Sequence, residues 1–126
     1  DRVVKPAPIA AGSYEGHIVL DATRLSLKWD LGVTASNATV SLAATGLDVE
    51  GSGTGRVNGD TLMLDVNWTL RSRNCGGTMR LRGTTANMNS AIIGELTYVD
   101  GCAGGGTKGG TFAMWKAGHR ESAITP

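Results

Sequence analysis

The sequence predicts an all-β fold, an eight-stranded antiparallel up-and-down β-barrel. About eight short stretches alternate apolar and polar residues, and short turns rich in Gly, Asn and Asp join them. No segment sustains the i, i+3, i+4 spacing of an amphipathic helix. Short connections favour antiparallel neighbours, and closing the meander removes its two exposed edges. A two-sheet β-sandwich with the same face pattern is the alternative.

The first half of the chain supplies four expected strands, at residues 13–21, 24–32, 37–45 and 47–57. Apolar residues recur at alternate positions along them, as in strands with one buried face. The links between them are Ala22-Thr23, Ala35-Ser36-Asn37 and Gly46. The residues expected to face inward are Tyr14, Ile18, Leu20, Leu25, Leu27, Trp29, Leu31, Val40, Leu42, Leu47 and Val49.

The second half supplies strands at 60–71, 76–84, 88–99 and 108–117, of which the first is the clearest. The Asn58-Gly59 pair before it predicts a type I′ hairpin, because both residues accept positive φ. Ala86-Asn87 and a glycine-rich segment from Gly101 to Thr107 form later turns. The residues expected to face inward are Leu62, Leu64, Val66, Trp68, Leu70, Met79, Leu81, Ile92, Leu96, Tyr98, Phe112 and Met114.

Length and composition indicate one domain at 13–117, with an N-terminal extension at 1–12 and a C-terminal tail at 118–126. Glycine is abundant, 19 of 126 residues, and we interpret it as turn chemistry between strands. The net charge of +1 gives no electrostatic reason to expect nucleic acid as a partner. No apolar run approaches the ~20 residues of a membrane-spanning helix, so we expect no membrane span.

Cys75 and Cys102 lie at the open end of the hairpin formed by the sixth and seventh expected strands. We expect them to form a disulfide that closes the hairpin base and tethers the glycine-rich loop, although two buried free thiols would fit the same positions. A disulfide indicates an extracytoplasmic location, periplasmic or secreted. Since the segment from Asp1 to Lys5 lacks an apolar core, we expect that a signal peptide has already been removed.

The expected inward face contains few charged residues and several aromatic ones. These aromatic residues either pack the core or line a pocket for a small apolar molecule, because an eight-stranded barrel can do both. The glycine-rich loop could then cover one mouth. The candidate ligand-binding residues are Tyr14, Trp29, Trp68, Tyr98 and Phe112. If the barrel is instead a cyclase or isomerase, Tyr14 and Tyr98 are the candidate catalytic acid–base residues.

Four arginines form the main charge cluster of the sequence, at Arg71, Arg73, Arg80 and Arg82. They fall on the outer face of two neighbouring strands, where Asp65 is expected opposite Arg82. The cluster is either a site for an acidic partner or a solvated face that deters edge aggregation. Trp115 breaks the alternation of Phe112 and Met114, so we expect it outside, as a contact residue or an oligomer anchor.

Neither a metal site nor a cofactor site is expected. The two histidines, His17 and His119, are far apart, and the cysteine spacing matches no zinc motif. The run from Cys102 to Gly110 superficially resembles a phosphate-binding loop, but it joins two expected strands and no helix follows Lys108.

Several stretches combine a Gly-Thr pair or an Asn-Gly turn with alternating residues, namely Gly53 to Leu62, Gly83-Thr84-Thr85 and Gly110 to Met114. In these features the chain resembles small exported bacterial β-domains with calycin-like up-and-down barrels that end in a Gly-Thr-Phe strand. The resemblance implies an extracytoplasmic barrel that serves as a ligand-binding, inhibitory or lipoprotein module. It carries over no site residues, because Ser13-Tyr14-Glu15-Gly16 replaces the Gly-x-Trp of lipocalins.

Together these observations favour an exported binding module that holds a small apolar ligand inside the barrel. Two alternatives remain open. One is a protein-binding or inhibitory envelope module that acts through its outer face and loops, and the other is a small barrel cyclase or isomerase.

Overall fold

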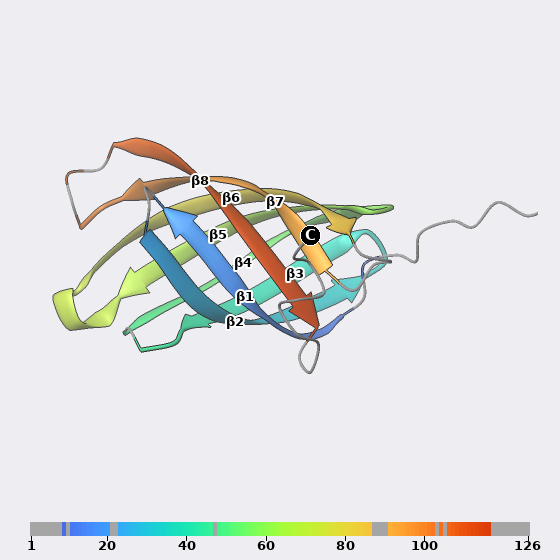
Figure 1. Ribbon diagram of the computed structural model, residues 1–126, viewed down its shortest axis with the longest axis horizontal. Coiled ribbons are helices and arrows are strands. Elements are labelled where there is room, and N and C mark those ends of the chain that lie inside the picture. Colours follow the sequence, from blue (N-terminus) through green and yellow to red (C-terminus); the bar gives the residue numbers. More distant parts are fainter. Residues whose placement is uncertain are drawn as a thin grey trace, which may run out of the picture.

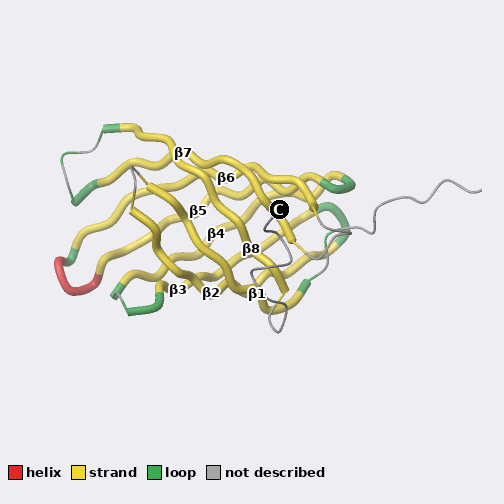
Figure 2. Tube along the Cα trace, in the orientation of Figure 1, coloured by secondary structure: helices red, strands yellow, loops and turns green. Residues whose placement is uncertain are grey.

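Eight antiparallel strands close into a single barrel in the computed structural model, which describes residues 9, 11–20, 23–46, 48–86, 91–102, 104 and 106–116 (Figure 1). The predicted up-and-down barrel is confirmed, and the sandwich alternative is wrong. A three-residue 3-10 turn between β5 and β6 is the helical element of the described residues (Figure 2). The elements are β1 (Gly12–Leu20), β2 (Thr23–Thr34), β3 (Asn37–Ala44), β4 (Val49–Asn58), β5 (Thr61–Leu70), η1 (Arg71–Arg73), β6 (Cys75–Ala86), β7 (Ala91–Asp100) and β8 (Thr107–Lys116).

Every expected strand is present, and its ends differ from the prediction by at most three residues. Each strand pairs with the next along the chain, and β1 pairs with β8 from Tyr14↔Lys116 to Leu20↔Gly110. This last pairing closes the barrel, so every strand has two hydrogen-bonded neighbours. The expected C-terminal tail, 118–126, lies outside the described residues. In the expected N-terminal extension, Ile9 is buried with the barrel core.

The β4–β5 turn differs from the predicted type I′ hairpin. Asn58 pairs with Thr61, so the two loop residues are Gly59 and Asp60. Gly59 has a φ of +64°, whereas Asn58 and Asp60 are not among the residues with positive φ. A positive φ at the first loop residue alone is the type II′ pattern, which places glycine at that position. The predicted loop, Asn58-Gly59, therefore lies one residue too early. The prediction followed the Asn-Gly pair, whereas the strand pairing keeps Asn58 in β4.

The interpretation of glycine as mainly turn chemistry is wrong. Twelve of the 19 glycines lie within strand bounds. A Cβ added at Gly53 would collide with the backbone carbonyl oxygen of Asp65, so β4 and β5 approach too closely there for any side chain. By register, the glycines on the inward side of the strands are Gly12, Gly16, Gly51, Gly53, Gly55, Gly77, Gly83, Gly94 and Gly110.

In one half of the barrel, a large side chain from another strand occupies the space that an inward glycine leaves. Phe112 lies over Gly83, and its ring is 6.3 Å from that of Trp29, centroid to centroid. The expected inward residues are buried or half-buried, except that Leu47 lies outside the described residues. Thus the half of the barrel that holds Trp29 and Phe112 is occupied by buried aromatic side chains.

Candidate functional site

A pocket of about 190 Å³ opens into the other half of the barrel, at the end where β1, β3, β5 and β7 finish. This is the left-hand end in Figure 1, where η1 and the β7–β8 connection lie. Every strand from β1 to β7 contributes to the lining, and Asp100 is the one charged residue in it. The lining residues are Ile18, Leu20, Leu25, Leu27, Leu42, Val49, Trp68, Met79, Tyr98 and Asp100.

Glycines at inward positions explain why this end is hollow. Gly51 separates Leu42 from Trp68 in the strand register, and Gly110 of β8 pairs with Leu20. These positions contribute no side chain at the level of the pocket. The aliphatic residues that remain leave a volume unfilled, whereas aromatic rings fill the corresponding space in the other half.

The rim of the pocket brings Trp68 and Asp100 to either side of Gly77. Gly77 pairs with Trp68 on β5 and with Asp100 on β7. A Cβ built on Gly77 would lie 3.0 Å from Cζ2 of Trp68, so the indole extends over this glycine toward β7. The indole of Trp68 and the carboxylate of Asp100 therefore lie on the two strands that flank Gly77.

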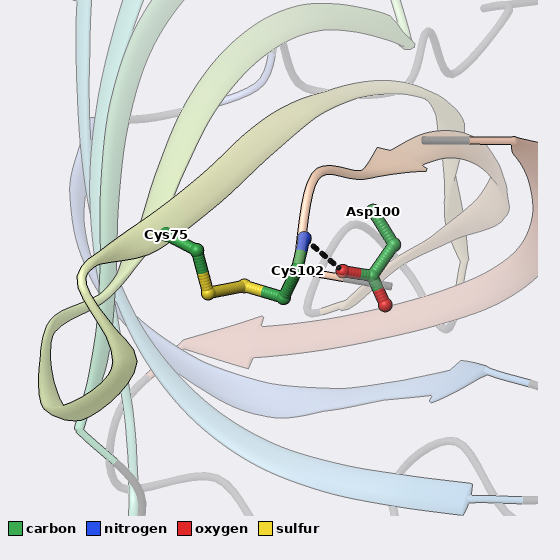
Figure 3. Close-up of a disulfide and its surroundings, with 3 residues drawn as sticks. All are labelled: Cys75, Asp100 and Cys102. Atoms are coloured by element: carbon green, nitrogen blue, oxygen red, sulfur yellow. Dashed lines mark hydrogen bonds between the residues drawn. A yellow bond between two sulfur atoms is a disulfide. The ribbon is translucent and has the colours of Figure 1, made fainter. Parts of the chain in front are cut away.

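The predicted disulfide between Cys75 and Cys102 is confirmed, with Cα atoms 5.3 Å apart (Figure 3). It joins the first residue of β6 to the connection between β7 and β8. The backbone N–H of Cys102 donates a hydrogen bond to Oδ1 of Asp100, at 2.9 Å. The bridge and this hydrogen bond together fix the start of the glycine-rich connection beside the pocket rim.

The structure divides the five candidate ligand-binding residues into two groups. Trp68 and Tyr98 line the pocket, whereas Tyr14, Trp29 and Phe112 belong to the packed core and do not contribute to its lining. Sequence reasoning missed Asp100 as a site residue. Its signal was the alternation Leu96, Tyr98, Asp100, which continues the inward face one step beyond the last apolar residue.

The two candidate catalytic tyrosines lie in opposite halves of the barrel. Tyr98 is two residues from the end of β7 at the pocket, whereas Tyr14 is two residues from the start of β1 at the opposite end. An acid–base pair formed by both is not assembled, because general acid and base must reach the same reacting group.

The arginine cluster is partly neutralised and does not converge. Nε of Arg80 lies 2.8 Å from Oδ1 of Asp65, and this hydrogen bond and the carboxylate charge raise the pKa of Arg80. Nη1 of Arg71 lies 3.4 Å from Oε2 of Glu50. Arg73 follows in η1, at the pocket end of the barrel.

The expectation that Asp65 lies opposite Arg82 is wrong. Four residues, 71–74, form the β5–β6 connection, and Asn74 adopts a φ of +52° at its end. This length pairs Leu70 with Cys75 and so brings Asp65 opposite Arg80. Arg82 instead lies between Met63 on β5 and Glu95 on β7.

Trp115 lies on the outer face as predicted, but it is only 7% exposed. It packs with Ala91 and Ala113 in a cluster separate from the core. Its Nε1 donates a hydrogen bond to Oε1 of Glu15 at 3.3 Å, and the His17 ring meets it edge-on at 5.8 Å. The prediction of an exposed Trp115 is therefore wrong, since the β1–β8 pairing places β1 side chains against it.

In the part of the chain that the structure describes, no group of three or more His, Cys, Asp or Glu residues could hold a metal ion. Within the same residues, no helix has the length and apolar character needed to cross a membrane.

Comparison with known protein families, with curated proteins and with solved structures found no match to this chain. The resemblance to calycin-like exported domains therefore stays a prediction.

Proposed function

We propose that the protein is a binding module that takes one small apolar molecule into the pocket at the disulfide end of the barrel. The observation that carries this proposal is the apolar pocket of about 190 Å³ at one end of the barrel interior. A cavity of about 150 Å³ lined by aliphatic and aromatic residues is enough to bind benzene. The expected ligand body is thus a single ring or a short branched chain.

The lining supports an apolar ligand on energetic grounds. Aliphatic side chains such as Ile18, Leu27 and Met79 offer hydrophobic contact, and burial of apolar surface stabilises a complex by about 25 cal/mol per Å². Trp68 and Tyr98 add aromatic surface at the rim. Few polar groups are present in the lining, so an apolar ligand leaves few of them without a hydrogen-bond partner.

Outer-face binding of a protein partner is less well supported. Arg71 and Arg80 already have carboxylate partners, and Trp115 is buried rather than presented to a partner. These carboxylates offset part of the positive charge that would attract an acidic protein. These observations favour the pocket over the outer face as the functional site.

We also propose that the protein acts in the periplasm or outside the cell. The Cys75–Cys102 disulfide is compatible with an extracytoplasmic protein, because disulfides persist in oxidising compartments.

Toluene is a suitable probe of the pocket. At 100 times its dissociation constant, a ligand that binds only the folded state raises the free energy of unfolding by about 2.7 kcal/mol. We expect saturating toluene to raise the melting temperature of the protein, as measured by calorimetry. A melting temperature that does not move at saturation contradicts the proposed function.

A matched pair of variants locates the binding. Val49→Phe enlarges a half-buried side chain that lines the pocket, and Ile93→Phe makes a similar change at an exposed position on the outer face of β7. We expect Val49→Phe to abolish the effect of toluene and Ile93→Phe to preserve it. Equal responses of both variants would place the binding outside the pocket.

A further inference from the structure

Asp100 is a carboxylate in an otherwise uncharged lining. It continues the inward alternation of Leu96 and Tyr98, so its side chain belongs to the barrel interior. The residue is only partly exposed. A partly buried carboxylate beside apolar side chains is costly unless a donor or a cation satisfies it.

Hydrogen bonds from the described residues use only one of the two oxygens of this carboxylate. Oδ1 of Asp100 accepts the N–H of Cys102. Among the described residues, no basic side chain forms an ion pair with Asp100; the ion pairs found are Arg71–Glu50 and Arg80–Asp65. Lys108, opposite Tyr98 on the inward side of β8, is exposed and forms no ion pair with Asp100. One carboxylate oxygen therefore remains for a donor that enters the pocket.

Aromatic residues line the same pocket as this oxygen acceptor. The indole of Trp68 extends over Gly77, which separates it from Asp100 in the register, and Tyr98 precedes Asp100 on the same face of β7. Aromatic faces attract cations, and a carboxylate forms its strongest hydrogen bonds with charged donors. An anionic group would meet repulsion from Asp100 at the same place.

We infer that the ligand is a small organic ammonium, whose charged group binds Asp100 beside Trp68 while its apolar body fills the pocket. This inference rests on the proposed function, because it names the ligand class of the same site. The ammonium N–H donates to the carboxylate oxygen that Cys102 does not use. The apolar body lies among Ile18, Leu27 and Met79.

Benzylammonium and toluene test this inference, since they share a ring and differ in the ammonium group. Both affinities are measured by titration calorimetry, and the indole ¹H–¹⁵N resonance of Trp68 reports binding at the rim. We expect benzylammonium to bind at least about tenfold more tightly than toluene. Weaker binding of benzylammonium than of toluene to the unmodified protein overturns the inference without any variant.

Asp100→Asn separates the charge from the structural role of the side chain. The amide oxygen of Asn can still accept the N–H of Cys102, so the turn is retained while the charge is lost. We expect this variant to bind benzylammonium about tenfold more weakly and toluene unchanged. Glu95→Gln makes the same change of charge on the exposed outer face and should leave both affinities unchanged.

The outcomes separate this inference from the proposed function. If toluene binds and Asp100→Asn leaves the affinity for benzylammonium unchanged, the ammonium inference is overturned and the binding module stands. If neither probe binds the unmodified protein, both are overturned. A selective loss of benzylammonium affinity in Asp100→Asn, with Glu95→Gln unaffected, supports both.

Discussion

At the scale of single residues, the turn between β2 and β3 contains a conformation that its side chain does not favour. Ala35 has a φ of +56°, in the left-handed region that costs an L-residue roughly 1–2 kcal/mol. Thr34 pairs with Asn37, so Ala35 and Ser36 form a two-residue loop. The sequence offers no glycine at this turn, so residue preferences alone could not predict the conformation of Ala35.

Ala35→Gly should therefore stabilise the protein. Glycine adopts positive φ without steric cost, which outweighs its greater freedom in the unfolded chain. We expect the free energy of unfolding, measured by urea denaturation, to rise by about 0.5–1 kcal/mol.

Ala43→Gly is the control, because Ala43 is exposed within β3. It should lower the free energy of unfolding by roughly 0.5–1 kcal/mol. Equal losses in both variants would show that Ala35 is not strained.

At the scale of elements, β4 shows what strand alternation predicts and what it leaves out. Its outward residues, such as Ser52 and Thr54, are exposed as the period-two pattern predicts. Its inward residues between Val49 and Val57 are glycines, which a search for apolar side chains overlooks. The alternation of Gly51, Gly53 and Gly55 was visible in the sequence, but their role depends on how closely β5 approaches.

Gly53→Ala should strongly destabilise the barrel. The added Cβ would meet the backbone carbonyl of Asp65, and a backbone contact cannot be relieved by turning a side chain. We expect the free energy of unfolding to fall by about 2–3 kcal/mol, at the upper end of overpacking costs.

Ser52→Ala, at the adjacent exposed position, should change the free energy of unfolding by less than about 0.5 kcal/mol. Denaturation of both variants in urea makes the comparison. A Gly53→Ala protein as stable as Ser52→Ala would show that β4 can move away from β5.

At the scale of the whole molecule, the sequence predicted the barrel but not the division of its interior. Alternation and short turns are local signals, and each strand carries its own. The hollow end depends instead on which residues meet across the interior, for example Leu42 and Trp68 on either side of Gly51. Asp65 and Arg80 show the same limit, because the length of a connection decides which charges become neighbours.

Removal of the disulfide tests how far the strand pairing stabilises the whole barrel without it. Cys75 and Cys102 are 27 residues apart, and opening a loop of this size costs about 3–4 kcal/mol in the chain-entropy model. We expect the Cys75→Ala, Cys102→Ala variant to lose that free energy of unfolding in urea denaturation.

The variant should retain the β-sheet circular dichroism of the parent protein, because the eight pairings remain. Loss of the β spectrum in the absence of denaturant would contradict this expectation and make the bridge essential for folding.

The pairing of β1 with β8 also has a consequence for how the chain reaches its native state. Tyr14 and Lys116 are neighbours in the barrel but come from opposite ends of the domain, and contacts between residues so distant in sequence form slowly. Until β1 and β8 pair, each of them presents an open edge that can pair with another chain. The unclosed barrel is therefore the state of this chain most exposed to edge-to-edge aggregation, and pairing of the last strand with the first removes that exposure.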